Sequence, residues 1–519
     1  MSMQTQQRFG RAPREGHSTP VLELEDSPPK LGAQLAEKMQ REILSEGLAV
    51  GHRMGAEPDL MAKYRVSRST LREAIRQLEA HGAIQMRRGG GGGLIVAEPP
   101  AQSAVRLLTT YLEIIDAAWD ELFEARIALE VTTAGLAARR ADEAQIARLR
   151  ALADRLREVG PRLDEVATHV AIRDLLGEMS GNPALALFVQ AFNRFTLEAV
   201  ASQVGGDRFE DSFVEATAAK RRIVDAIVAR NDAAAQSAAR EDLDNRREVL
   251  RDMQEKSAAA EGDGSGEAAA GSPRRLGYEV KMGQTLAIRI AHEILRQGKP
   301  VGSKLGAEPD LLSRYRVSRA VFRESVRILE SHGLVQARRG YQGGVIVGRP
   351  NPDYTVRTAA AYLQHLRLDP ASLEEVRAPA AVVAARLAAR RGSPADCERL
   401  KHLLDVQLAA EGGANTEAAA QVQIQIGEMS GNRALALIMR VVIATNWRSP
   451  HRPLPNPEFG QLQESHKALV AAVIAGDEPL AEGRMVQHVR NVRRWLVAVN
   501  AGSGPSAAAP VSIDQGEQA

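Results

Sequence analysis

The sequence predicts a mainly α-helical protein made of two tandem copies of one unit, in which a winged helix-turn-helix domain precedes an all-helical bundle. The first observation is a repeat, because SRSTLREAIRQLE at 67–79 returns as SRAVFRESVRILE at 318–330. The second is that the long stretches after these segments are rich in Ala, Leu and Arg, with apolar residues three and four apart. The length of 519 residues suits about three or four domains.

The composition divides the chain into seven expected segments. These are a disordered leader (1–30), winged helix-turn-helix 1 (31–98), helical bundle 1 (102–254), a linker (255–280), winged helix-turn-helix 2 (281–349), helical bundle 2 (353–500) and a disordered tail (501–519). The leader and the tail are polar and lack an apolar period, and the linker is rich in Gly, Ser and Ala.

Each winged domain is predicted to contain three helices and a hairpin. In the first copy the expected elements are helices Leu31–Ser45, Glu57–Tyr64 and Ser67–His81, then strands Ile84–Arg88 and Leu94–Val96 around a glycine run. In the second copy they are Leu286–Arg296, Glu308–Tyr315, Ser318–His332, Val335–Arg339 and Val345–Val347. Two helices joined by a short turn form a helix-turn-helix, and the hairpin adds a wing.

The third helix of each copy is predicted to read double-stranded DNA. Its preceding serine can cap the helix, and the first turns of such a helix enter the major groove. Guanidinium groups suit this role because their fork pairs two acceptors at once, on guanine or on phosphate. The expected contacts are Ser67, Arg68, Ser69, Thr70, Arg72 and Arg76 in copy one, and Ser318, Arg319, Arg323 and Arg327 in copy two. The alternative is an amphipathic surface helix with solvated arginines.

The hairpins are predicted to contact the minor groove or a phosphate. A glycine-rich tip allows close approach, and paired arginines favour the negative potential of a narrow groove. The residues concerned are Arg87, Arg88 and Gly89 in copy one, and Arg338, Arg339 and Gly340 in copy two. The alternative is a loose turn. A nucleotide-binding loop is excluded because no Gly-Lys-Ser/Thr follows and the glycine run joins two strands.

Composition and charge narrow the function classes. A net charge of +2 requires that any DNA contact comes from a local basic surface. The single cysteine, Cys397, cannot form an internal disulfide, and no uninterrupted apolar run reaches the ~18 residues of a membrane span. The start of the sequence lacks the apolar core of a secretory signal, so we expect a cytoplasmic protein. No nucleophile–base pair, nucleotide loop or metal ligand set indicates an enzyme.

These motifs resemble the GntR family of bacterial repressors, in particular the subfamily with an all-helical FCD effector domain. The resemblance is carried by GAEPDL at 55–60, YRVSR at 64–68, LREA at 71–74, FEAR at 123–126 with Glu130, and EMSGN at 178–182, which returns at 428–432. It implies an operator bound as a dimer and a small metabolite bound in the bundle. We expect the two repeats of one chain to form an internal pseudo-dimer, with a further homodimer left open.

The same resemblance marks candidate effector residues. The family places an Asp and a His four residues apart, with two later His, around a divalent metal. Copy one has His169, Arg173, Lys220 and about Leu243 at these positions, and copy two has Ala419, Gln423, His466 and His488. Two imidazoles without a carboxylate make a poor metal site, so no metal and no other cofactor is expected.

In the absence of a metal, the resemblance leaves basic side chains as the anion clamp. Arg126 and Arg377 occupy the family's cavity arginine, and Arg173 with Lys220 adds positive charge in copy one. A solvated helix face is the alternative for these cations, and ordinary surface or core histidines for His466 and His488. Copy two carries Ala381 where copy one has Glu130, so its bundle is expected to be more apolar.

The expected function is a sequence-specific transcriptional regulator, a repressor by resemblance, with two DNA-reading heads and a metabolite effector. The alternative is an architectural or scaffold protein whose bundles mediate assembly only. A thermal shift on adding acyl-CoA, steroid or organic-acid panels separates the two, because a ligand of the folded state raises its stability.

Overall fold

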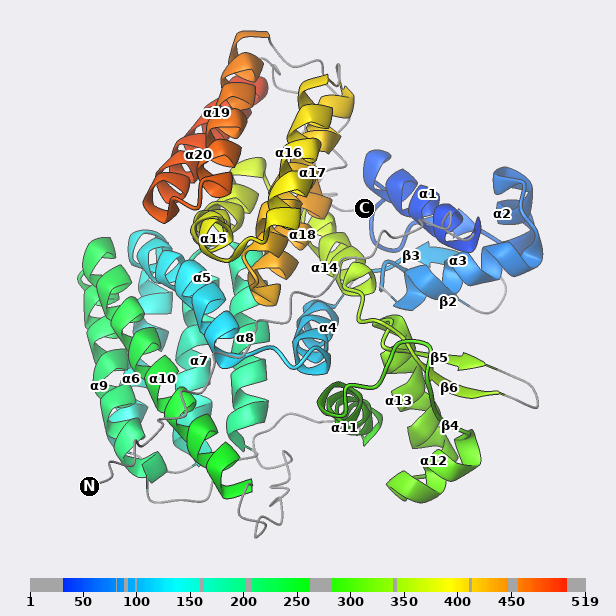
Figure 1. Cartoon of the computed structure of the whole chain (residues 1–519), viewed down its shortest axis with the longest axis horizontal. Helices are drawn as coiled ribbons and strands as arrows, with labels where there is room; N and C mark the ends of the chain where they lie inside the picture. Colours follow the sequence, from blue (N-terminus) through cyan, green and yellow to red (C-terminus); the bar gives the residue numbers. More distant parts are fainter. Residues whose placement is uncertain are drawn as a thin grey trace, which may run out of the picture.

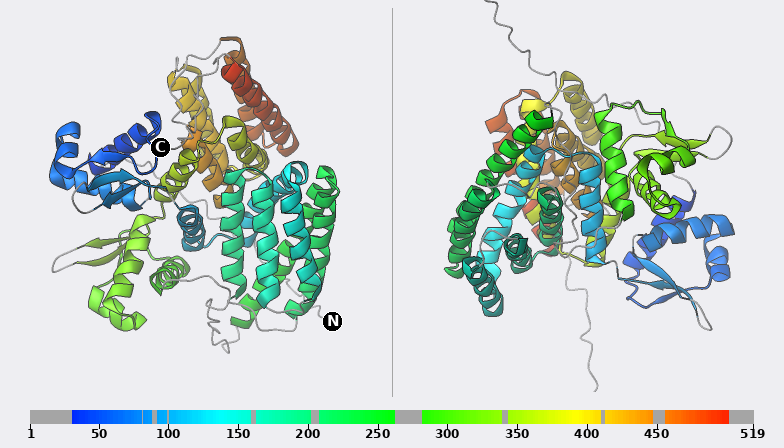
Figure 2. Two further views of the ribbon diagram at one scale, coloured as in Figure 1. Left: turned by 180° about the vertical axis from the view of Figure 1, so that it is seen from behind. Right: turned by 90° about the horizontal axis from the view of Figure 1, so that it is seen from below.

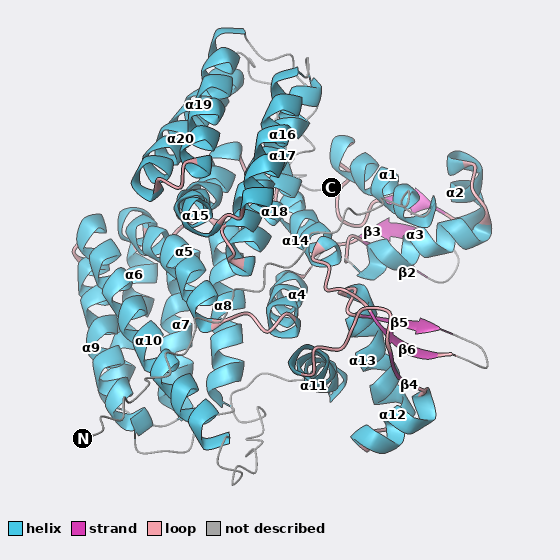
Figure 3. Ribbon diagram, in the orientation of Figure 1, coloured by secondary structure: helices cyan, strands magenta, loops and turns pink. Residues whose placement is uncertain are grey.

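The computed structural model describes residues 31–80, 82–87, 92–98, 100–158, 163–201, 208–261, 282–338, 343–409, 413–446 and 456–501 (Figure 1). This part of the chain is mainly helical, and its strands form two small sheets (Figure 3). The expected leader and tail lie outside the described residues. No helix within the described part is long and apolar enough to cross a membrane.

Residues 31–96, called head 1, form three helices and a three-stranded sheet. The elements are α1 (Leu31–Ser45), β1 (Arg53–Gly55), α2 (Glu57–Tyr64), α3 (Arg68–Ala80), β2 (Ile84–Arg87) and β3 (Gly93–Val96). Strand β3 lies between β1 and β2, antiparallel to both. The core is apolar and includes Met39, Leu60, Leu71 and Leu94. It presses α3 against the sheet, so one face of that helix is buried and the opposite face meets solvent.

Residues 282–347, called head 2, repeat this arrangement element by element. The elements are α11 (Met282–Arg296), β4 (Lys304–Gly306), α12 (Glu308–Tyr315), α13 (Arg319–Ser331), β5 (Val335–Arg338) and β6 (Gly344–Val347). The strand order β4-β6-β5 and the register match head 1. Helix α11 begins at Met282, one turn before the predicted Leu286.

The strands β1 and β4 were not predicted from the sequence. Each has three residues, too few to display an alternating pattern. Their pairing explains two glycines: Gly93 and Gly344 have φ of +146° and +150°, and a Cβ on either would lie 2.6 Å from the carbonyl oxygen of Gly55 or Gly306. Only glycine permits this approach of two backbones.

Among the described residues, each head is followed by seven helices. Bundle 1 consists of α4 (Ala101–Ile114), α5 (Trp119–Arg140), α6 (Glu143–Glu158), α7 (Leu163–Met179), α8 (Pro183–Ala201), α9 (Arg208–Val228) and α10 (Asp232–Glu261). Bundle 2 consists of α14 (Asp353–His365), α15 (Pro370–Arg391), α16 (Pro394–Ala409), α17 (Gly413–Met429), α18 (Arg433–Asn446), α19 (Asn456–Ile474) and α20 (Glu478–Ala501). The linker expected from residue 255 is wrong at its start, because α10 continues to Glu261.

The two bundles meet through α5 and α15, which lie side by side (Figures 1 and 2). One apolar core spans the contact and contains Leu122 and Leu129 of α5 with Val376 and Ala380 of α15. At its edges Arg140 pairs with Glu375 and Arg391 pairs with Glu124. These two ion pairs occupy equivalent positions in the repeat, so each bundle offers the same patch to the other.

The repeated EMSGN motif supplies the polar part of this contact. Asn182 accepts hydrogen bonds from the first amides of α8 through Oδ1, and its Nδ2 donates to Glu375 Oε2 at 2.9 Å and to the Ser372 carbonyl. Asn432 likewise caps α18 and donates to Glu124 Oε2 at 2.9 Å. Each asparagine therefore begins a helix in one bundle and holds a carboxylate of the other.

Replacing Asn182 tests this double role. We expect Asn182→Ala to lower the free energy of unfolding by about 1–3 kcal/mol, because a helix cap and a bond to the half-buried Glu375 carboxylate disappear together. Asn231→Ala is the matched control, since Asn231 caps α10 through the Ala234 amide on an exposed surface. Urea unfolding should give a larger loss for Asn182→Ala, and equal losses would contradict the assignment.

Candidate functional site

The first turns of α3 and α13 present their polar side chains to solvent. Ser67 Oγ accepts a hydrogen bond from the Thr70 amide at 3.2 Å, and Ser318 Oγ accepts one from the Val321 amide at 3.3 Å, so both predicted caps are present. The Arg72 and Arg323 side chains are 59% and 60% exposed. The face predicted to read DNA is thus solvent-accessible in both heads.

A glutamate at the start of the preceding helix holds these arginines. Glu57 Oε1 accepts hydrogen bonds from Arg72 Nε at 2.8 Å and from Arg68 Nε at 3.2 Å. These bonds lower the pKa of the Glu57 carboxyl. In head 2, Glu308 accepts from Arg323 Nε at 3.1 Å and pairs with Arg319 at 3.4 Å.

Sequence reasoning missed both glutamates. The sequence feature that could have indicated these ion pairs is the spacing of 15 residues between the glutamate and the arginine, which is the same in the two copies.

The remaining predicted contacts have mixed outcomes. Ser69 and Thr70 lie within 2.9 Å of Ser67 Oγ and form a small hydroxyl cluster. Arg76 donates to Glu73 on its own helix, and Arg327 is exposed on α13. Arg87 and Arg338 end the strands β2 and β5 with exposed side chains. The other wing residues, Arg88, Gly89, Arg339 and Gly340, lie outside the described residues.

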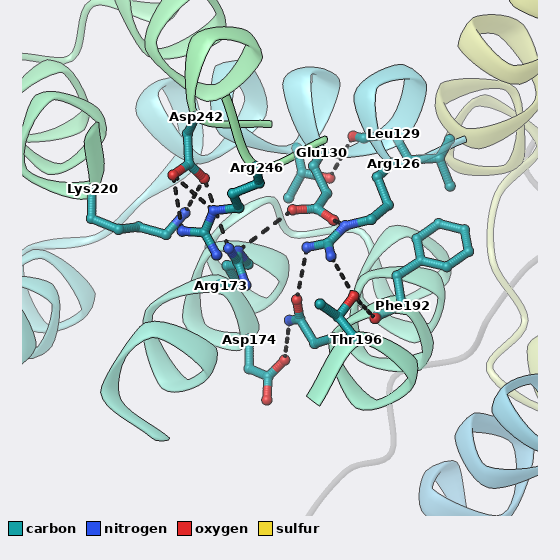
Figure 4. Close-up of polar contacts among 12 residues, drawn as sticks. Arg126, Leu129, Glu130, Arg173, Asp174, Phe192, Thr196, Lys220, Asp242 and Arg246 are labelled. Atoms are coloured by element: carbon teal, nitrogen blue, oxygen red, sulfur yellow. Dashed lines mark hydrogen bonds and ion pairs between the residues drawn. The ribbon is translucent and has the colours of Figure 1, made fainter. Parts of the chain in front are cut away.

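Bundle 1 encloses a buried cluster of charged side chains, drawn in Figure 4. Arg126, on α5, is fully buried and donates from Nε to Glu130 Oε1 at 2.6 Å and from Nη1 to Thr196 Oγ1 at 2.6 Å. Its Nη2 donates to Asn193 Oδ1 at 3.2 Å. The guanidinium is also 5.3 Å from the Phe123 ring centroid. Two helices, α5 and α8, therefore fix this arginine.

The same cluster continues to α7, α9 and α10. Lys220 Nζ donates to Asp242 Oδ2 at 2.7 Å, and both side chains are buried. Arg173 lies between the two carboxylates, 3.9 Å from Glu130 and 3.8 Å from Asp242. Among the described residues no acceptor makes a hydrogen bond with Arg173 Nε or Nη2, although the side chain is only 4% exposed.

The electrostatics of this cluster favour an added negative charge. Four basic side chains (Arg126, Arg173, Lys220 and Arg246) lie with three acidic ones (Glu130, Asp174 and Asp242). Desolvation, together with the Arg173 charge, lowers the pKa of Lys220 to about 8. Burial lowers the pKa of His169 to about 3, so its ring is neutral at pH 7. Burial raises the pKa of Asp174 to about 6.

Bundle 2 holds a neutral network at the corresponding place. Arg377 donates from Nε and Nη2 to the two oxygens of Glu374, at 2.6 and 2.7 Å. The His466 ring lies between Gln423 at 2.8 Å and Gln407 at 2.9 Å. It also stacks on the His488 ring, with centroids 4.2 Å apart. This network is polar but carries no excess charge, so bundle 2 is less charged here than bundle 1 without being apolar.

Two further expectations need correction. The alternative that the four cations lie on a solvated helix face is wrong. All seven candidate effector side chains are buried, namely Arg126, His169, Arg173, Lys220, Arg377, His466 and His488. The family position assigned to about Leu243 falls instead on Asp242, which pairs with Lys220, whereas Leu243 packs against Phe123. The turns between α9 and α10 and between α19 and α20 have the same length, residues 229–231 and 475–477, so the offset that relates Lys220 to His466 places Asp242 at the position of His488.

The family's divalent metal does not fit either bundle. In bundle 1 the cations Arg173 and Lys220 occupy ligand positions and would repel a metal ion. In bundle 2, His466 and His488 have no carboxylate beside them, and their nitrogens face amides and Ser465. Within the described ranges, no group of three His, Cys, Asp or Glu side chains is placed to hold a metal.

A cavity of about 520 Å³ lies between α9 and α10, close to the buried cluster along both helices. Its lining comes from Ala218, Arg222, Asn245, Glu248, Val249 and Asp252. None of the cluster residues lines it, so it is a surface feature and not the cluster itself.

Comparison with known proteins identifies parts of the chain. Residues 121–245 and 373–491 match the FCD domain, and residues 31–93 match the bacterial regulatory proteins of the gntR family. A putative L-lactate dehydrogenase operon regulatory protein of Escherichia coli K12 is 30% identical over 233 residues, covering 43% of this chain and 87% of the relative. The galactonate operon transcriptional repressor of the same strain is 26% identical, covering 41% of this chain and 93% of the relative.

Among solved structures, the GntR protein of Streptococcus agalactiae is 22% identical, with a TM-score of 0.30 over 42% of this chain and 99% of its own.

The buried histidine His466 predicts a pH dependence. Burial lowers its pKa from 6.5 to about 3, so the unfolded chain binds the proton more readily and stability falls as the pH drops from about 6.5 towards 3. We expect His466→Gln to reduce the slope of unfolding free energy against pH in that window by about 1.4 kcal/mol per pH unit. His402→Gln, on the exposed face of α16, is the control and should leave the slope unchanged. Equal slopes for all three proteins would refute the assignment.

Proposed function

The chain belongs to the GntR family of bacterial regulatory proteins that carry FCD domains, and on that premise we propose that it places two DNA-reading heads and a metabolite receptor in one polypeptide. It is a DNA-binding transcriptional regulator. The observation that supports two heads is that α3 and α13 each expose an arginine face. The arginines of the two faces are bonded by glutamates at equivalent positions, Glu57 and Glu308. As in the named galactonate repressor, we infer that it represses transcription.

The second head is our proposal, because the family model covers residues 31–93 and the other evidence is geometric. Head 2 has the same order of helices and strands as head 1, the same register and the same serine cap. We therefore divide the described chain into winged helix 1 (31–98), bundle 1 (102–261), winged helix 2 (282–349) and bundle 2 (353–501).

The two repeats act as an internal pseudo-dimer in this proposal. The support is the reciprocal contact of α5 and α15, in which Asn182 and Asn432 exchange the same bonds with Glu375 and Glu124. An isologous contact of this kind is what a two-fold dimer uses. The pair of bundles then replaces the association of two separate chains, and a further pairing of chains stays open.

The two heads are proposed to read unlike half-sites. Head 1 offers Ser69 and Thr70, whose hydroxyls can bond to base edges or phosphates, whereas head 2 offers Ala320 and Val321 at the same positions. The apolar pair suits a thymine methyl group. Footprinting with half-site swaps tests this, and identical preferences of both heads would refute it.

The effector is proposed to be a small carboxylate bound at the charged cluster of bundle 1. The observation that carries this is Arg173, buried with two donor nitrogens that make no hydrogen bond in the described structure. Carboxylates form bidentate charge-assisted bonds with guanidinium groups. Relatives named for lactate and galactonate operons point to hydroxy acids, so L-lactate and D-galactonate are the first probes.

The alternative function, a scaffold whose bundles only mediate assembly, is favoured by one observation. The polar groups of bundle 2 satisfy one another, through Arg377 with Glu374 and His466 with two glutamines. A thermal shift with the two probes, and with acyl-CoA and steroid panels, separates the hypotheses. A chain that binds DNA and shows no shift with any of them is a scaffold.

DNA binding provides a direct test of the heads. We expect Arg72→Ala and Arg323→Ala each to weaken operator binding by about 1–3 kcal/mol, because each loses a base or phosphate contact. Genomic fragments selected on the purified protein supply the operator for gel-shift titration. Arg150→Ala, exposed on α6, is the control. Unchanged affinity for Arg323→Ala alone would restrict DNA reading to head 1.

Effector binding is tested at Arg173. An effector at 100 times its dissociation constant should stabilise the chain by about 2.7 kcal/mol, which a thermal melt detects. We expect Arg173→Met to abolish the shift caused by the active probe while DNA affinity persists, because α7, the helix that carries Arg173, lies apart from both heads (Figure 1). Arg150→Met should retain the shift. A shift that survives in Arg173→Met would place the effector elsewhere.

A further inference from the structure

Helix α4 of the first repeat forms part of head 2. Its last residue, Ile114, is fully buried in the apolar core of head 2 with Leu286 and Ile290 of α11. Gln284 Nε2, on α11, donates to Thr110 Oγ1 at 3.1 Å, and both side chains are buried. Figures 1 and 2 show α4 beside α11 although more than 170 residues separate them. In the described residues the core of head 1, by contrast, contains only residues of head 1.

Two more contacts tie α4 to head 2. His292 Nε2 donates to the Glu113 carbonyl oxygen at 3.0 Å. The Tyr111 ring lies 5.8 Å from the ring of His332, the residue that ends the helix α13. His332 in turn lies 3.2 Å from Thr355 Oγ1 on α14. The end of the proposed recognition helix of head 2 therefore rests against α4.

The opposite side of α4 is connected to the charged cluster of bundle 1. Thr109 Oγ1 donates to the Ala191 carbonyl oxygen of α8 at 3.2 Å. Two residues further along α8, Asn193 accepts a hydrogen bond from Arg126, and Thr196 accepts another. Helix α8 thus connects the cluster to α4, and α4 connects α8 to head 2, which also contacts α14 through His332.

The second repeat lacks the side chains that make this connection. At the equivalent positions Ala361 replaces Thr110, Ala33 replaces Gln284, Arg41 replaces His292, His365 replaces Ile114 and Ile443 replaces Asn193. Alanine offers no hydrogen bond, so the buried Gln284–Thr110 bond has no counterpart between head 1 and α14. The repeat that makes this connection is also the repeat whose bundle carries the excess charge, bundle 1.

We propose that ligand binding in bundle 1 alters the packing of head 2 through α4 and leaves the internal packing of head 1 unchanged, although head 1 directly precedes α4 in the chain. The inference rests on the proposed effector site and specifies its output. An anion bound at Arg173 disturbs Arg126, because both guanidinium groups pair with Glu130. The hydrogen bonds of Arg126 to α8 then change, and α4 repacks against α8 with head 2 attached. Packed helices shift between discrete arrangements, so a small displacement at the cluster moves the whole head. The effector then alters the spacing of the two heads on the operator.

A variant without ligand tests the connection. Thr196→Val removes an acceptor of Arg126 at nearly constant volume. In the full chain we expect hydrogen exchange to rise several-fold in α4, α11 and α13, and to stay unchanged in α1 and α3. The active probe, L-lactate or D-galactonate, should change exchange in the same three helices of the wild-type chain.

The matched control replaces three residues at the contact between α4 and α11 by those found at the equivalent positions of the other repeat. It combines Thr110→Ala, Gln284→Ala and His292→Arg. In this background Thr196→Val should still alter α4 but no longer α11 and α13. Equal responses of the two heads, no response of α4, or a response of head 2 that survives the triple change would overturn the proposal. A response to Thr196→Val without any response to either probe would support the connection and reject the proposed effector class.

Discussion

The structure depends on the contact between α5 and α15. There a glutamate of each bundle accepts hydrogen bonds from an asparagine and an arginine of the other. Glu124 accepts hydrogen bonds from Arg391 at 2.8 Å and from Asn432 at 2.9 Å while only 8% exposed. A buried carboxylate is costly unless its oxygens are satisfied, so these donors specify one register for the two helices. The register fixes where α4 and α14 emerge, and these helices position the heads.

Duplication within one chain has let the two bundles diverge around a common arginine. Arg126 is paired with Glu130, four residues later on its helix, and Arg377 with Glu374, three residues earlier. At the position of Glu374 the first repeat has Phe123, which faces the Arg126 guanidinium instead. A dimer of identical chains must carry the same site twice, whereas a fused pair need not. One site has kept a charge excess, and the other has become a closed neutral network.

The sequence predicted local features better than tertiary ones. The helices and the serine caps of α3 and α13 were predicted closely, because capping residues and apolar spacing act within a few residues. The strands β1 and β4 were missed because three residues carry no pattern, and α10 runs past the predicted start of the linker because Ala, Glu and Lys favour helix. Glu57 and Asp242 were missed as well, since the choice of an ion-pair partner depends on how distant helices pack.

Glu57 and Glu308 give each head an internal competitor for its own arginines. The carboxylate stands where a DNA phosphate would otherwise be the natural partner, and it is held by two guanidinium groups in head 1. On the proposal that these arginines bind DNA, any duplex must displace this acidic group and tolerate it nearby. Random sequence offers only phosphates in exchange, whereas the operator adds hydrogen bonds to base edges. The cost of displacing the glutamate would then apply to every duplex, and base contacts at the operator would offset it.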